Sequence, residues 1–277
     1  MQIPALIDTH THFDVADFDP DRLAVAMQAK QNGVQALLLI GFVAKRFDAL
    51  VRVQQQLNQH STTTPKVLLA PGLHPFYIQQ HQPDDLHQLE QFINTHPSIA
   101  IGEIGLDTFT AEMKQPDVFA RQQAFFSAQL ELARQFNLPV LLHIRRAHAD
   151  TLAILKKHRF SHGGIAHAFG GGIEEAKALI KLGFKLGITG QVTNPNAKRL
   201  HQVIREVGAA HLVIETDCPD MTPLCCQLST EHRTRNTPAN LPFVLDGLSQ
   251  ILNVDREKLA EQLWQNSLES LNLNWNY

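Results

Sequence analysis

Residues 3–12 read Ile-Pro-Ala-Leu-Ile-Asp-Thr-His-Thr-His, a short apolar run that turns abruptly polar. The run has the length and composition of a buried strand, and it predicts a first β-strand over Ile3–Ile7. An open, doubly wound sheet would place a glycine-rich phosphate turn directly after such a strand. No glycine occurs until Gly33, so this segment favours a (β/α)8 barrel over the open sheet.

Further apolar runs rich in Val, Ile and Leu follow, separated by amphipathic stretches, which is the pattern of repeated strand–helix units. The predicted strands are Ile3–Ile7, Gln35–Ile40, Lys66–Ala70, Ser98–Ile101, Pro139–Leu142, Gly163–Ala166, Phe184–Gly187 and His211–Ile214. The predicted helices are 19–32, 46–59, 84–94, 116–136, 147–158, 173–181, 196–206, 239–251 and 255–270. No Ser/Gly linker or block of charge divides the chain. We therefore predict one α/β domain over residues 1–277, a single (β/α)8 TIM barrel, rather than two domains.

The composition indicates a globular protein of nearly balanced charge. The 277 residues carry 24 Lys and Arg against 27 Asp and Glu, a formal net charge of −3, which excludes a protein that coats nucleic acid. The longest uninterrupted apolar stretch, Ala36–Ala44, is about half as long as a membrane span requires, and the N-terminus lacks the basic region of a secretory signal. The odd set of Cys218, Cys225 and Cys226 fits reduced thiols. We expect a cytoplasmic protein that involves no membrane and no obligate protein partner.

Metal-ligating side chains recur at the ends of the predicted strands, where the loops of a barrel converge on one mouth. They are His10 and His12 after the first strand, Glu103 after the fourth, His143 after the fifth, His167 after the sixth and Asp217 after the eighth. His10 and His12 are two residues apart on an extended backbone, so both imidazoles face the same side. Burying an unpaired carboxylate costs several kcal/mol, so Glu103, which interrupts an apolar segment, should meet either a metal or an arginine.

Together these residues predict a two-metal hydrolase. Glu103 can bridge two ions, His143 and His167 come from adjacent strands, and Asp217 can bind metal and also accept a proton from water. Two divalent ions bring more positive charge than the two carboxylates remove, which suits an anionic substrate such as a phosphate ester. Nitrogen-rich ligation favours Zn, Mn, Co or Fe, whereas Mg prefers more oxygen ligands.

Four more residues are candidates for substrate contact or for holding a ligand in place: His74, Arg145, Arg146 and Glu215. His74 precedes a proline, where it could contact substrate or cap a turn. Glu215 could orient a ligand imidazole or form a structural ion pair. Arg145 and Arg146 could meet phosphates, although most surface arginines are merely solvated.

The sequence resembles the TatD family of metal-dependent hydrolases, a branch of the amidohydrolase-like barrels, over most of its length. The landmarks are IDTHTHFD (7–14), GLHP (72–75), GEIGLD (102–107), LPVLLH (138–143), HAFGG (167–171) and ETDCP (215–219). The two arginines after His143 and the Pro-Asp-Met that follows Cys218 are most similar to the YjjV-type subgroup. Arg146 stands where many members have Asp, which concerns the choice of substrate.

The resemblance implies a barrel with two divalent metal ions. One would be held by His10, His12, Glu103 and Asp217, and the other by Glu103, His143 and His167. It also implies hydrolysis of ester bonds, with phosphodiesters as the expected substrates and DNA as one candidate, because deoxyribonuclease activity is often proposed for relatives. In that reaction a metal-bridging hydroxide would attack and Asp217 would accept its proton.

Two alternatives remain open at this point. A hydrolase of amides or carboxylic esters would keep the metal centre and change the bond. Barrels of that kind often bridge their metals with a carboxylated lysine, and the nearest lysine after Glu103 is Lys114, which disfavours this branch. A metal-stabilised binding protein without useful catalysis is the second alternative. It does not explain why two acids and four histidines would be kept at an open centre.

Overall fold

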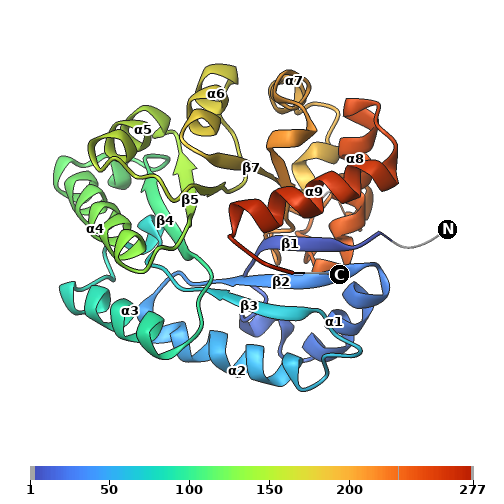
Figure 1. The fold of residues 1–277 in the computed structure, drawn as a ribbon, viewed down its shortest axis with the longest axis horizontal. Coiled ribbons are helices and arrows are strands. Elements are labelled where there is room, and N and C mark those ends of the chain that lie inside the picture. The colour runs from blue at the N-terminus through green and yellow to red at the C-terminus, as the bar shows by residue number, and fades with distance from the viewer. Residues whose placement is uncertain (1–3, 230, 276–277) are drawn as a thin grey trace.

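The computed structural model describes residues 4–229 and 231–275, in which parallel strands alternate with helices (Figure 1). The strands are β1 (Leu6–Thr11), β2 (Val34–Ile40), β3 (Lys66–Ala70), β4 (Ile101–Asp107), β5 (Val140–Arg145), β6 (Gly164–Ala166), β7 (Phe184–Ile188) and β8 (Leu212–Ile214). The α-helices are α1 (Arg22–Gln31), α2 (Phe47–Asn58), α3 (Pro83–Thr95), α4 (Pro116–Gln135), α5 (His148–Lys157), α6 (Ile173–Lys181), α7 (Lys198–Val207), α8 (Leu241–Leu252) and α9 (Arg256–Ser270). Short 3-10 helices lie in the loops: η1 (Ala16–Phe18), η2 (Ala44–Arg46), η3 (Pro75–Tyr77), η4 (Glu112–Lys114), η5 (Gly190–Thr193), η6 (Ala209–His211), η7 (Leu224–Cys226) and η8 (Pro238–Asn240).

The strands lie side by side in sequence order and close into a barrel. β1–β3 form one hydrogen-bonded ladder and β4–β8 a second. Backbone hydrogen bonds join the two ladders at both seams. Next to β3, the Gly102 N–H donates to the Pro71 carbonyl at 3.0 Å, and after β8 the Asp217 N–H donates to the His10 carbonyl at 2.9 Å. The predicted (β/α)8 barrel is confirmed, and Figure 1 shows the helices outside the strands.

Apolar side chains pack in two layers, one inside the barrel and one under the helices. Along β2, Leu37 and Leu39 belong to the layer shared with the helices, whereas Leu38 and Ile40 belong to the interior layer. Successive side chains of a strand point to opposite faces, and both faces are buried here. The strands therefore read as continuous apolar runs in the sequence. Trp264 of α9 packs into the interior layer.

The predicted helices agree closely with the observed ones, but three predicted strands end too early. β1, β4 and β5 run on to Thr11, Asp107 and Arg145 instead of stopping at Ile7, Ile101 and Leu142. His10, Glu103 and His143 therefore lie within strands, not after them as predicted. The predicted start of the fourth strand is also wrong, because β4 begins at Ile101 and not at Ser98. The prediction followed the apolar side chains, whereas backbone pairing continues through polar residues wherever the neighbouring strand offers partners. Ile3, at the start of the first predicted strand, lies outside the described residues.

None of the helices in the described ranges combines the length and the apolar character needed to cross a membrane.

Candidate metal centre

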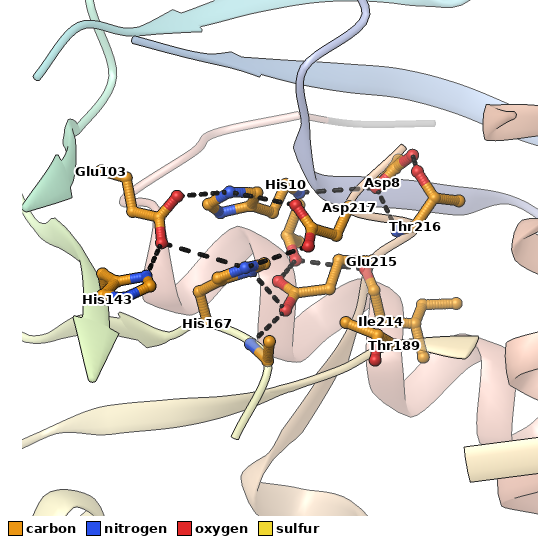
Figure 2. A network of polar contacts seen from close by, with 12 residues as sticks. Asp8, His10, Glu103, His143, His167, Thr189, Ile214, Glu215, Thr216 and Asp217 are labelled. Atoms are coloured by element: carbon orange, nitrogen blue, oxygen red, sulfur yellow. Dashed lines mark hydrogen bonds and ion pairs between the residues drawn. The ribbon is translucent and has the colours of Figure 1, made fainter. Parts of the chain in front are cut away.

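Imidazoles and carboxylates from five of the eight strand positions converge at one end of the barrel (Figure 2). His10 lies in β1, His12 directly after it, Glu103 in β4, His143 in β5, His167 directly after β6 and Asp217 after β8. The structure thus brings together all six residues that the sequence predicts as metal ligands. Their atoms fall into overlapping groups in which potential ligand atoms lie within 4.8 Å of one another.

Glu103 lies at the middle of this cluster, and its two oxygens face different histidines. Oε2 lies 3.1 Å from His10 Nε2 and 3.7 Å from His12 Nε2. Oε1 lies 2.7 Å from His143 Nδ1 and 3.9 Å from His167 Nε2. The carboxylate therefore spans two separate groups of imidazoles, and no arginine neutralises it among the described residues.

Asp217 repeats this arrangement from the opposite seam of the barrel. Its Oδ1 lies 3.8 Å from His10 Nε2 and 3.7 Å from His12 Nε2, whereas Oδ2 lies 3.6 Å from His167 Nε2. The Asp217 side chain is 14 % exposed and that of Glu103 only 2 %. Both carboxylates span the cluster, but Asp217 is the one that solvent reaches more readily.

The imidazoles keep both acids ionised despite their burial. Burial would raise the pKa of Glu103, but electrostatic interactions with the surrounding imidazoles, led by His74 and His167, outweigh it and hold the pKa well below its usual value. Burial would likewise raise the pKa of Asp217, and the charge and hydrogen bond of His167 outweigh it. Two anions packed this closely need positive charge between them, because a buried charge without compensation is costly.

The ring nitrogens of the cluster fit a bound cation. In the described part of the chain, both nitrogens of His10 and Nδ1 of His12 are buried without a hydrogen-bond partner. His10 Nε2 lies 3.1 Å from Glu103 Oε2, yet the ring is not aligned to donate to it. Burial also lowers the pKa of His10, which favours the neutral ring that ligates metal. Lone pairs on buried nitrogens next to carboxylate oxygens form a mixed N/O donor set suited to a divalent ion.

Two acids outside the cluster contact imidazoles that belong to it. Glu215 Oε1 lies 2.9 Å from His167 Nδ1 (Figure 2). The same oxygen accepts a hydrogen bond from the Ala168 N–H at 2.7 Å. Asp107 Oδ2 lies 3.0 Å from His143 Nε2. A carboxylate behind a ligating histidine fixes the ring and its tautomer. Glu215 therefore contacts His167 as one sequence alternative predicts, whereas Asp107 received no role from the sequence.

A sequence signal for Asp107 did exist. Residues 103, 105 and 107 share one face of a strand because side chains alternate with a period of two. Asp107 thus faces the same side as Glu103, and its register partner is Arg145, two residues beyond His143 on β5. Because the predicted fourth strand ends at Ile101, the prediction does not place Glu103 and Asp107 on one face of the same strand.

Glycines in two strands make room for the cluster. A Cβ on Gly187 in β7 would lie 2.3 Å from Glu215 Oε1, so only glycine leaves space for that carboxylate. Gly105 in β4 has a φ of 143°, and a Cβ there would lie 2.1 Å from the His143 carbonyl oxygen. Both positions require glycine because any other side chain would displace a residue that supports the site.

His74 caps a turn, one of the two roles that the sequence left open, and its other ring nitrogen faces the cluster. Its Nδ1 accepts a hydrogen bond from the Phe76 N–H at 2.9 Å, which caps η3. Its Nε2 lies 3.3 Å from Glu103 Oε1. Because Nδ1 accepts, the proton of the neutral ring is on Nε2 and points at the cluster. Burial lowers the pKa of His74 to about 4, which keeps the ring neutral.

Asp8 joins the two chain segments that carry the cluster residues of the first and last strands. Its Oδ1 accepts from the Thr216 N–H at 2.9 Å and its Oδ2 from the Thr216 hydroxyl at 2.5 Å (Figure 2). Burial raises the pKa of Asp8 to about 7, although the bonds from Thr216 oppose the shift. Further along the same two segments, the His12 N–H donates to the Cys218 carbonyl at 2.9 Å. His10, His12 and Asp217 are therefore positioned by one seam.

A pocket of about 740 Å³ opens onto the cluster, and Glu103, His143 and Asp217 are part of its lining. The lining from the loops after β2 and β3 includes the aromatic rings of Phe42, Phe76 and Tyr77 beside His74. The Phe42 and Tyr77 ring centroids lie 5.3 Å apart. The lining from the end of β5 includes two cationic side chains, Arg145 and Arg146, next to His143 and Ile144. The pocket thus offers both stacking surfaces and positive charge beside the cluster.

A parallel barrel with such a centre at its mouth places the protein among the metal-dependent hydrolases. Residues 7–272 match the family model described as TatD related DNase, so the chain belongs to the TatD family. The predicted family and its YjjV-type subgroup are confirmed. The "uncharacterized metal-dependent hydrolase YjjV" of Escherichia coli K12 is 32 % identical over 269 residues, which cover 96 % of this chain and 98 % of that protein.

Two further comparisons extend this result. The crystal structure of YjjV from E. coli K12 matches with a TM-score of 0.86 at 32 % identity, and the match covers 99 % of this chain and 100 % of that one. A protein of Pectobacterium parmentieri named "3′-5′ ssDNA/RNA exonuclease TatD" is 28 % identical over 258 residues, which cover 92 % of this chain and 95 % of that protein.

Proposed function

We propose that the protein hydrolyses phosphodiester bonds with the help of two divalent metal ions, and that its substrate is DNA or a smaller phosphate ester. The observation that carries this proposal is that the two oxygens of each central carboxylate face different groups of histidines. Glu103 and Asp217 each direct one oxygen to His10 and His12 and the other to His167. One ion alone would not require two carboxylates that both span the cluster.

The proposed ligands divide into two sets that share Glu103. The first ion would be held by His10, His12, Glu103 and Asp217, and the second by Glu103, His143 and His167. When bound, the ions would lower the pKa of an attacking water and neutralise charge that develops on the phosphoryl oxygens. The donor set suits Zn, Mn, Co or Fe, and Mg is a further candidate.

The residues of the chain supply proton transfer and positioning. Asp217 is the natural proton acceptor because it is ionised and is the more exposed of the two central acids. His74 presents an Nε2 proton to the cluster and can donate it as a hydrogen bond to a substrate oxygen. Asp107 and Glu215 hold the rings of His143 and His167.

The lining of the pocket supports a nucleic acid substrate. Aromatic rings of Phe42 and Tyr77 provide faces on which a base can stack, and stacking of this kind tolerates any sequence. Arginines at the end of β5 provide charge for phosphates. The printed name of the Pectobacterium parmentieri relative, an exonuclease for single-stranded DNA and RNA, supports the same substrate class.

The free thiols support a reducing compartment. Cys218 is buried, and Cys225 and Cys226 have their sulfur atoms 3.9 Å apart without a bond. We therefore propose a cytoplasmic location.

The test combines metal content with hydrolysis. We expect about two metal ions per chain, and cleavage of single-stranded DNA and of a small chromogenic phosphodiester that chelation abolishes and added Mn, Zn or Mg restores. Glu103→Ala removes the carboxylate shared by both sets, so it should lose bound metal and hydrolysis while the barrel stays folded by circular dichroism. Glu261→Ala, an exposed change on α9, is the matched control and should behave as wild type.

Three results would each contradict a different part of this proposal. Wild-type turnover by the Glu103→Ala variant would overturn the bridging role. Bound metal without phosphodiester cleavage would overturn the proposed bond, and a panel of amides and carboxylic esters would then follow. Metal that raises stability while no ester or amide is cleaved would identify a binding protein.

A further inference from the structure

Two consecutive arginines at the rim of the pocket share one aromatic ring. The guanidinium carbon of Arg145 lies 3.5 Å from the ring centroid of Phe109, and that of Arg146 lies 4.7 Å from it. Both arginines are exposed and line the same pocket as the metal centre. Stacking on the ring restricts both side chains, so their charges are held at the mouth of the pocket.

Neither guanidinium has an acid of its own. Within residues 4–229 and 231–275, no carboxylate lies within ion-pair distance of either arginine. Arg233, which lines the same pocket, is by contrast paired with Asp220 at 2.8 Å. The charge of Arg145 does lower the pKa of Asp107, but less than the hydrogen bonds that Asp107 accepts. Two uncompensated positive charges therefore remain at the rim.

The backbone places both side chains on one side. Successive residues of a strand point to opposite faces, but Arg146 has a φ of 58° in the left-handed region, which breaks the alternation after β5. Thr108 holds this conformation. Its hydroxyl donates to the Arg146 carbonyl at 2.8 Å, and its N–H donates to the Arg145 carbonyl at 2.9 Å. An unfavourable backbone conformation that tertiary contacts maintain is typical of a functional site.

We propose that Arg145 and Arg146 bind a second phosphate of the substrate, the one next to the phosphate ester that is cleaved. This inference rests on the proposed function and deepens it. Arg145 follows the candidate ligand His143 by two residues on the same side of β5, a spacing of about 7 Å along the strand. Neighbouring phosphates of a nucleotide chain have a comparable separation. A planar guanidinium can donate two parallel hydrogen bonds to two oxygens of one phosphate. The ammonium group of a lysine acts instead as a strongly hydrated point charge.

The experiment measures binding of two nucleotides that differ by one phosphate. Thymidine 5′-monophosphate and thymidine 3′,5′-bisphosphate are titrated into the metal-loaded protein by calorimetry. We expect the wild type to bind the bisphosphate about tenfold more tightly, as one charge-assisted contact predicts. The double variant Arg145→Gln/Arg146→Gln should bring the ratio of the two affinities close to one. Arg52→Gln removes an exposed arginine on α2 that is not part of the pocket lining, and it should keep the wild-type ratio.

A second variant tests the stacking. Phe109→Leu keeps both charges but removes the ring that holds them, so it should reduce the ratio partially, by about threefold, without abolishing it. An unchanged ratio in the double variant would overturn the proposal. So would an equal loss of affinity for both nucleotides, because that result describes general attraction and not a second phosphate site. Neither titration requires turnover, so a protein that cleaves no phosphodiester but shows the ratio would refute the proposed function alone.

Discussion

Asp107 contacts the proposed metal centre only through another side chain. It accepts a hydrogen bond from the Phe109 N–H at 2.7 Å with one oxygen and faces His143 Nε2 at 3.0 Å with the other. A carboxylate in this place holds the proton on Nε2 and leaves Nδ1 free toward Glu103. The identity of Asp107 thus decides which nitrogen of His143 can ligate.

Asp107→Asn tests this effect at a single residue. The amide keeps the size and one acceptor, but its N–H would favour the His143 tautomer that carries the proton on Nδ1. We expect the affinity for one of the two ions to fall about 10- to 100-fold, measured by competition with a chromogenic chelator. Asp150→Asn, an exposed change on α5, serves as the control. Unchanged affinity in Asp107→Asn would mean that Asp107 does not orient the ligand.

The sequence predicts the six cluster residues because each is a metal-type side chain next to an apolar run. It does not predict the roles of His74 and Asp107 to the same degree. His74 takes its tautomer from the Phe76 N–H, and Asp107 acts through His143, so both roles depend on contacts across strands. A pattern along the chain carries no information about which nitrogen of a ring faces which oxygen.

At the scale of elements, α4 supports the loop after β3 and the end of β4 with two buried glutamines. Gln129 accepts from the Leu73 N–H at 2.7 Å and donates to the Leu73 carbonyl at 3.1 Å. Gln122 does the same for Asp107, at 2.8 Å and 3.0 Å. The two glutamines are seven residues apart, so they lie on one face of the helix. One helix therefore fixes the backbone beside both His74 and Asp107.

Gln129→Leu removes the support of the His74 loop and keeps the volume. The Leu73 N–H and carbonyl would be left buried without partners, so we expect the free energy of unfolding to fall by about 2 kcal/mol and hydrolysis to slow as well. Denaturant unfolding and steady-state kinetics measure the two effects. Gln123→Leu, the same change at a half-buried position without such bonds, should alter neither. A variant as stable and active as wild type would show that the loop holds itself.

The helices are predicted almost to the residue, whereas the strands are predicted only as apolar cores. Helices begin and end with local signals, such as Pro116 at the start of α4 or Gly183 after α6. The length of a strand depends on what the neighbouring strand pairs with. Glu103 and His143 lie beyond the predicted ends of β4 and β5, and the strand character of these parts is set by pairing across the sheet.

At the scale of the whole molecule, the proposed ions would connect both ladders of the barrel. His10 belongs to the ladder of β1–β3, and Glu103 and His143 to the ladder of β4–β8. A ligand that binds only the folded state stabilises it by mass action, by about 2.7 kcal/mol at 100 times its Kd. We expect metal loading to raise Tm by several degrees, measured by thermal unfolding with and without chelator. The Glu103→Ala variant should show no such rise, and an equal rise in both proteins would place the stabilising ions elsewhere.

The seam between the first and last strands has a consequence for how the protein is made. Thr11 and Cys218 touch there although they are 207 residues apart in the chain, and the side chains next to them belong to the metal cluster. A ribosome that has synthesised the first strand must still add almost the entire barrel before Asp217 exists. Contacts of such high sequence separation form late and slowly. A nascent or prematurely terminated chain therefore holds only part of the proposed ligand set. A centre that binds its full complement of metal would mark a polypeptide whose synthesis and folding are complete.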